Sequence, residues 1–262
     1  MVDQVTTLAD PAPTPDIAQL KLLPEFQDVT VEKRKKSYLI GGVSYQRVTT
    51  ALNIIDKPGL KYWAVNKALE SVHDWLDGPD AENTDAMLAW AKGAPDRTKN
   101  EAADRGTETH SLVERIINEG PQVREEVPEE LLPAVDGAVA YLKDYDITVI
   151  ATEQTVWSTS LKVAGTFDGI GFMGDKLIIF DWKRSKNIYW NFALQLGAYA
   201  KMLGELTGAV PAEAHVVRLA QDEGPLYEVE VLTELDAAYS AYLAALALHR
   251  AGKTKWRASE PS

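Results

Sequence analysis

The chain of 262 residues contains no cysteine and only four histidines, which are widely spaced. The absence of cysteine excludes disulfides, thiolate zinc sites, cysteine-ligated iron–sulfur clusters and a cysteine nucleophile. Any metal must therefore bind to oxygen and imidazole ligands, and this donor set favours magnesium or manganese over zinc. We expect Mg²⁺ or Mn²⁺ as the cofactor and no iron–sulfur cluster.

Long apolar runs are also missing. No run approaches the roughly 20 residues that a membrane-spanning helix needs. The first residues, MVDQVTTLADPAPTPD, have neither a basic start nor an apolar core, so they do not resemble a secretion signal. These absences predict a cytoplasmic protein without a membrane partner.

Basic residues are scarce: 27 lysines and arginines face 39 aspartates and glutamates, so the net charge is −12. Taken alone, this balance argues against nucleic-acid binding, which usually leaves a basic footprint. The basic residues are clustered, however, at EKRKK (32–36), DRTK (96–99), KRSK (183–186) and KTKWR (253–257). One such cluster is more often a solvated surface than a binding site. The KRSK cluster differs from the others because it begins beside carboxylates.

The composition divides the chain into three parts. Residues 1–20 are rich in proline and poor in large apolar residues, which predicts a flexible tail. Residues 21–97 are expected to form a hairpin and a helical region, with the hairpin turn at Gly41-Gly42 in YLIGGVSYQRVTT. Residues 98–262 are expected to form the core domain, which ends in a helix.

Periodicity predicts the secondary structure. Helical spacing of apolar residues predicts helices at 59–76, 84–92, 98–118, 128–145, 191–208 and 233–252. Gly93 and Pro95 are expected to separate the second helix from the third. Alternating or continuous apolar runs predict strands at 147–158, 163–173, 176–184, 213–220 and 225–232. This order is typical of an α/β fold with a mixed central sheet.

Three charged residues stand in or beside apolar strands in GTFDGIGFMGDKLIIFDWKRS (165–185): Asp168, Asp181 and Lys183. A carboxylate at the edge of a core is costly unless it is paired or bound to a metal. Asp181 and Lys183 are two apart, so they share one face of a strand while Trp182 points to the other. The pattern is compatible with a surface ion pair, and also with a magnesium site whose lysine polarises a phosphate.

The segments GTFDGI, IIFDWK and QLGAY, taken together, resemble the PD-(D/E)XK nuclease superfamily. Within it they look most like the RecB-like branch, which includes CRISPR-associated exonucleases and standalone nucleases of actinobacterial phages. The resemblance covers roughly residues 100–220. It implies a restriction-endonuclease-like core of a helix, three antiparallel strands, a helix and a strand, with a helical N-terminal extension. Many relatives carry four cysteines that hold an iron–sulfur cluster, whereas this chain has none.

The family motifs imply roles for the strand residues. Asp168 matches the aspartate of the second motif and Asp181 matches the acidic residue of the third, so both are expected to ligate metal. Lys183 matches the catalytic lysine. The backbone carbonyl of Trp182 is expected to be a further metal ligand.

Further motif residues lie on helices. His110, in RGTETHSLVE, matches the histidine metal ligand of the RecB-like branch. Gln195 and Tyr199 match a Gln-x-x-x-Tyr motif that lies close to the catalytic site; one helical turn separates them, so they face the same way. Glu114 and Glu153 are open between a role near the metal and a purely structural one.

The N-terminal region offers candidates for DNA contact, namely Arg47, Lys61, Trp63 and Lys67, because basic and aromatic side chains suit single strands. Trp63 is more simply explained as a core residue. The residues and the resemblance together predict a metal-dependent DNA exonuclease of phage or host recombination and repair. Its partners would be DNA and a recombination or single-strand annealing protein, and an oligomer is compatible. The alternatives are a structure-specific endonuclease, an inactive recombination scaffold and a magnesium-dependent nucleotide phosphohydrolase.

Overall fold

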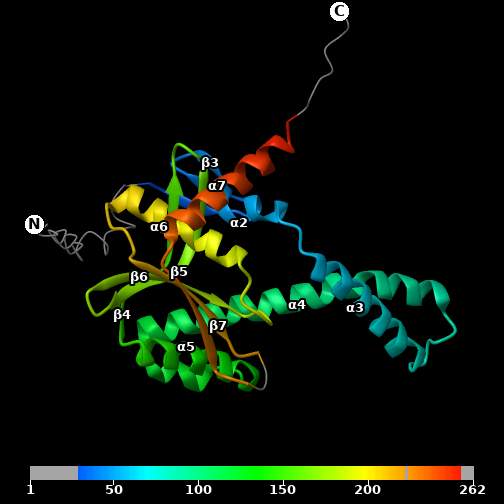
Figure 1. The fold of residues 1–262 in the computed structure, drawn as a ribbon. Helices are drawn as coiled ribbons and strands as arrows, with labels where there is room; N and C mark the ends of the chain where they lie inside the picture. Colours follow the sequence, from blue (N-terminus) through cyan, green and yellow to red (C-terminus); the bar gives the residue numbers. More distant parts are fainter. Residues whose placement is uncertain (1–28, 222–223, 255–262) are drawn as a thin grey trace, which may run out of the picture.

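The computed structural model describes residues 29–221 and 224–254 (Figure 1). One mixed sheet of eight strands runs through them in the order β1-β2-β3-β5-β6-β7-β8, and β4 pairs with β5 outside this path. Its strands are β1 (Val31–Lys33), β2 (Ser37–Ile40), β3 (Val43–Arg47), β4 (Ile147–Ser158), β5 (Val163–Met173), β6 (Lys176–Lys183), β7 (Glu213–Leu219) and β8 (Tyr227–Leu232).

Helices cover both faces of this sheet (Figure 1). On one face, α6 and α7 form an apolar core with β5 and β6; on the other, the C-terminal part of α4 and α5 form a second core with β6 and β7. The helices are α2 (Val48–Ala51), α3 (Pro58–Leu76), α4 (Thr84–Glu119), α5 (Leu132–Asp144), α6 (Asn191–Thr207) and α7 (Leu235–Ala251), with 3₁₀ turns at Leu52–Ile54, Pro121–Glu126 and Glu129–Leu131.

The predicted fold class, α/β with a mixed central sheet, is confirmed. Strands β4, β5 and β6 form an antiparallel meander, and α6 then leads to β7, which is parallel to β6. With α5 before the meander, this is the expected restriction-endonuclease-like order of a helix, three antiparallel strands, a helix and a strand. The apolar run LIIF lies in β6 and is buried on both faces, as a central strand between two helical layers must be.

The hairpin around Gly41-Gly42 is confirmed, and both glycines have positive φ angles of 54° and 77°. L-residues with side chains rarely adopt such angles, which explains the glycine pair at this turn. β1 adds a further strand to this hairpin, within the segment that we interpreted only as a basic cluster. β3 then pairs in parallel with β5, so the N-terminal strands belong to the main sheet.

The prediction of separate helices at 84–92 and 98–118 is wrong, because α4 continues through both Gly93 and Pro95. Proline removes one backbone hydrogen bond from a helix interior. Here Ala91 and Ala94 beside it are buried, and such tertiary packing overrides local helix propensity. The domain boundary expected between 97 and 98 thus falls inside a helix, and the division into domains stays a prediction.

Together, α3 and the N-terminal half of α4 extend away from the sheet as a helical pair (Figure 1). Their contact includes the rings of Trp75 and Trp90, whose centroids are 6.1 Å apart. Trp63 is half-buried in α3, in keeping with its interpretation as a packing residue. Among the described residues, no helix is long and apolar enough to cross a membrane. The expected tail at 1–20 and most of the basic cluster at 253–257 lie outside the described residues.

Candidate metal centre

The candidate site lies where two strands diverge along one edge of β5. β3 pairs with Val163 and Ala164, whereas β6 pairs with residues 169–173. Beyond Phe180, β6 leaves β5, and the backbone N–H of Trp182 donates to Oδ2 of Asp168 at 2.6 Å. The carboxylate thus takes the place of a ladder hydrogen bond. This contact fixes Asp168 beside the end of β6, where Asp181 and Lys183 lie.

Both glycines of the GTFDG motif make room for aromatic rings. A Cβ atom on Gly165 would lie 2.2 Å from the Tyr199 ring, and one on Gly169 would lie 2.1 Å from the Phe180 ring. These separations are far below van der Waals contact. The glycines therefore let α6 and β6 approach Asp168 closely from either side.

Replacing Gly165 with alanine is expected to lower the free energy of unfolding by about 1–3 kcal/mol, because the added methyl group overpacks the site against Tyr199. Gly106 in α4 has open space at its Cβ position, and so it provides a matched control. Alanine at Gly106 should be neutral or stabilise by about 1 kcal/mol, since alanine is the better helix former. Urea unfolding of the two variants measures the difference, and equal stabilities would contradict the role given to Gly165.

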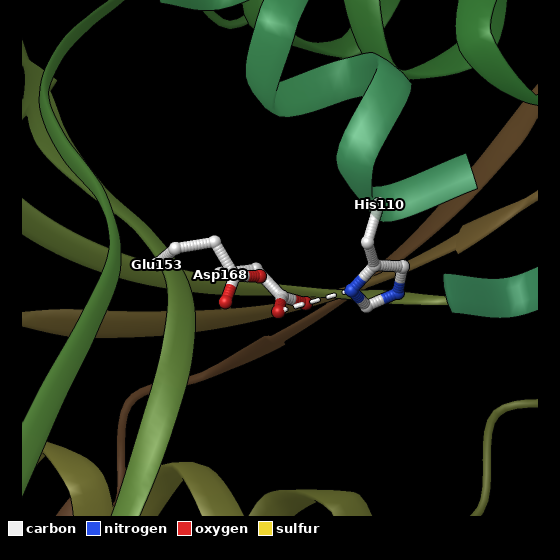
Figure 2. Close-up of side chains that lie close together, drawn as sticks. All are labelled: His110, Glu153 and Asp168. Carbon is white, nitrogen blue, oxygen red and sulfur yellow. Dashed lines mark ion pairs between the residues drawn. The ribbon is translucent and has the colours of Figure 1, made fainter. Parts of the chain in front are cut away.

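Three residues from separate elements converge on a potential cation site: His110 from α4, Glu153 from β4 and Asp168 from β5 (Figure 2). One ligand atom from each lies within 4.8 Å of the other two. Nδ1 of His110 is 3.1 Å from Oδ1 of Asp168. An imidazole nitrogen with two carboxylates is a donor set that suits Mg²⁺ or Mn²⁺. Sequence and geometry agree on His110 and Asp168, and geometry adds Glu153.

Glu153 reaches this position through an unusual backbone conformation. Its φ angle is +51°, in the left-handed region that non-glycine residues rarely occupy, and it follows a bulge between Val149 and Ala151. Its carboxylate lies 3.4 Å from the ammonium of Lys33 in β1. Burial and the neighbouring Asp168 carboxylate raise the pKa of Glu153 above its ordinary value. A cation bound to both carboxylates would relieve this repulsion.

The charges around Asp168 counteract the effect of burial on its pKa. Burial raises the pKa of Asp168, but the His110 imidazole, the Lys183 ammonium and the Trp182 N–H outweigh it and hold this pKa below its usual value. Burial lowers the pKa of His110, yet Asp168 and Glu153 together raise it above the ordinary value. The carboxylate is thus held ionised, which is the state that a metal ligand requires.

A second group of polar residues follows on β6 and α6. Asp181 is only 2% exposed and forms an ion pair with Lys183. Nε2 of Gln195 lies 3.3 Å from Oδ1 of Asp181 and 3.2 Å from the hydroxyl of Tyr199. Lys183 Nζ lies 5.0 Å from the centroid of the Phe192 ring. Burial lowers the pKa of Lys183 to about 8, although Asp168 opposes the shift.

The structure thus brings nearly all the expected site residues together. Asp181 belongs to the lysine-bearing group rather than to the three-residue cation group. The Trp182 side chain is buried in the core on the opposite face, as strand alternation predicts, and its N–H faces the site. The roles of its carbonyl and of half-buried Glu114 stay predictions.

A pocket of about 210 Å³ adjoins the site and shares Glu153 and Tyr199 with it. Its other walls come from the N-terminal strands, α2 and β5, and they include Lys33 and Arg47. The Arg47 guanidinium donates to the backbone carbonyl of Arg34 and lies over the Tyr38 ring, 4.8 Å from its centroid. Two cationic side chains thus line the pocket that shares Glu153 with the carboxylate cluster. The sequence singles out Arg47 as a candidate for DNA contact, whereas it indicates Lys33 only as one member of the basic cluster at 32–36.

Comparison with solved structures yields a weak likeness. No family model matches the chain, and no curated protein matches it. Among solved structures, the fold is similar to that of a candidate exonuclease from Eubacterium rectale, with a TM-score of 0.38 and 13% identity. The match covers 58% of this chain and 69% of the other. A likeness at this level says nothing about the chemistry of this chain.

Proposed function

We propose that the protein is a metal-dependent DNA exonuclease of the PD-(D/E)XK superfamily, in its RecB-like branch. The observation that carries the proposal is that a potential cation site and a lysine–aspartate pair lie side by side at the ends of the strands. His110, Glu153 and Asp168 form a cation site, and the Asp181–Lys183 pair lies next to it through the Trp182–Asp168 hydrogen bond. A buried lysine beside a hard-cation site suits the hydrolysis of a phosphodiester.

The donor set fits a divalent cation. Oδ2 of Asp181 is buried, and within the described part of the chain the Lys183 ammonium is the partner that it contacts. His110, Glu153, Asp168 and Asp181 would hold Mg²⁺ or Mn²⁺, which supplies charge neutralisation and a water of lowered pKa. The protein itself orients the reacting groups. Lys183 would donate to a non-bridging phosphate oxygen and stabilise the negative charge that develops there.

Two features support DNA as the substrate despite the net charge of −12. A bound cation offsets the carboxylates, and the pocket beside them offers Lys33 and Arg47 to a phosphate backbone. Lys61 and Lys67 are further candidates outside this pocket; like Lys33, which is paired with Glu153, each has an acidic neighbour, Asp56 and Glu70 respectively. The proposed setting is phage or host recombination and repair, with a single-strand annealing protein as the expected partner.

The experiment that tests this function is degradation of linear duplex, single-stranded and closed circular DNA with Mg²⁺ or Mn²⁺. We expect loss of linear but not of circular DNA, no loss in EDTA, and no loss with Asp181→Ala or Lys183→Ala. End-labelled substrates give the polarity. Cleavage of circles would replace the exonuclease with an endonuclease. DNA binding without cleavage would indicate a scaffold, and hydrolysis of nucleotides alone would indicate a phosphohydrolase.

A further inference from the structure

A short loop between β6 and α6 exposes two large aromatic rings close to the proposed catalytic lysine. Tyr189 is 46% exposed and Trp190 is 61% exposed. The Tyr189 ring packs edge-on against Phe192, with centroids 5.6 Å apart, and Phe192 in turn lies under the Lys183 ammonium. The aromatic surface is therefore continuous with the site. Large exposed rings next to a polar site often mark a binding surface.

The loop holds these rings in place. The backbone N–H of Phe192 donates to the carbonyl of Tyr189 at 2.9 Å, and that of Ala193 donates to the carbonyl of Trp190 at 3.2 Å. These two bonds form the first turn of α6, so both aromatic residues stand on the start of a helix of 17 residues. Earlier in the loop, the Ser185 hydroxyl donates to the Asn187 carbonyl at 2.8 Å. The rings are thus presented by a defined turn.

The charge around the loop favours one kind of ligand. Lys183 ends β6, and Arg184 and exposed Lys186 follow it in the loop before the aromatic residues. Cations beside flat apolar rings suit a ligand that carries both phosphates and accessible aromatic faces, which is a nucleic-acid strand with unpaired bases. Bases inside a duplex are stacked on each other and cannot lie on these rings. A purely apolar protein partner would offer no counter-charge to exposed Lys186.

We propose that Tyr189 and Trp190 form a stacking platform for unpaired bases of the strand whose phosphodiester is at the site. The platform lies next to Lys183, so the bases bound there are those adjacent to the reacting phosphate. This inference rests on the proposed function and adds a substrate class to it: single-stranded DNA, or a duplex whose end is unpaired. Stacking tolerates every base, so we expect little sequence preference.

The test measures DNA binding by fluorescence anisotropy in an Asp181→Asn background, with Mg²⁺ present. The probes are a labelled single-stranded oligonucleotide and a blunt hairpin duplex. Trp190→Ala is expected to weaken single-strand binding about tenfold and duplex binding less than twofold, whereas Trp190→Phe keeps most of the affinity. Tyr62→Ala is the matched control, because Tyr62 is 74% exposed on α3, away from the loop. We expect it to change neither affinity, and thermal unfolding should show all variants folded.

Salt dependence separates stacking from charge. Trp190→Ala should leave the slope of log K against log salt unchanged, whereas Lys186→Ala should make the slope shallower by about one.

Equal loss of affinity for both probes, or no loss with Trp190→Ala, would overturn the platform. Selective loss of binding to an annealing protein would also overturn it. If the wild type cleaves DNA and Trp190→Ala binds normally, only the platform fails. If single strands bind through Trp190 but no DNA is cleaved, only the nuclease proposal fails.

Discussion

Substituting Asp168 with asparagine is expected to reduce metal-dependent DNA cleavage by at least about a thousandfold, which corresponds to about 4 kcal/mol of transition-state stabilisation. Asparagine keeps the shape of the side chain and its carbonyl can still accept from the Trp182 N–H, so the fold should survive. It removes the charge that faces both His110 and Lys183. It also removes a ligand from the cation group.

The same variant should lose cation binding, and this readout does not depend on activity. Titration with Mn²⁺, followed by its paramagnetic signal, is expected to show at least about tenfold weaker binding for Asp168→Asn. Asp175→Asn is the control, because Asp175 is an exposed residue at the β5–β6 turn of the same hairpin. Cleavage within tenfold of wild type, or unchanged Mn²⁺ affinity, would show that Asp168 is a structural carboxylate only.

The sequence predicts the parts of this site that depend on local geometry. Asp181 and Lys183 share a face because side chains in a strand alternate, and Gln195 and Tyr199 share a face because they are one helical turn apart. The pairing of β5 with β6 follows from the turn-forming residues between them, Gly174 and Asp175. Residues whose placement depends only on such local rules can be predicted from the sequence alone.

The parts that the sequence misses depend on long-range packing or backbone strain. The sequence leaves Glu153 open between a role near the metal and a structural one; its place in the cation group depends on a bulge and a left-handed φ angle in β4, which no residue type there signals. The helix break expected at Pro95 is absent because buried neighbours hold α4 together. Trp190 could equally have been a core residue, since its exposure is set by where α6 packs. Pattern alone gives no access to these three outcomes.

The residues around Asp168 are also closely packed against one another. Asp168 bonds to β6 through the Trp182 N–H, and the two glycines of GTFDG admit Tyr199 and Phe180. A bulkier residue at either glycine would push α6 or β6 away from the carboxylate. The motif is therefore a packing solution as well as a source of ligands. This explains why a sequence pattern of small residues around one aspartate can report on a three-dimensional site.

Substituting Lys183 with alanine is expected to lower kcat for DNA cleavage by about a hundred- to a thousandfold, with a smaller effect on KM. The reason is that its ammonium stabilises charge that develops only in the transition state. Lys176→Ala is the matched control, because it removes an exposed lysine from the opposite end of the same strand, β6. An equal loss of kcat in both variants would show that the loss of any positive charge, and not the position of Lys183, causes the effect.

Lys183 also predicts how the reaction depends on pH. Burial lowers its pKa to about 8, so the side chain is charged below that pH and increasingly neutral above it. If the charged form stabilises the transition state, kcat should fall as the pH rises through about 8. Lys183→Arg keeps its charge well above that range, because a guanidinium does not lose its proton there. Whatever activity this variant retains should therefore show no fall near pH 8. A fall of the same shape in both proteins would assign the titration to another group, and Lys183 would then be left with a purely positional role beside Asp181.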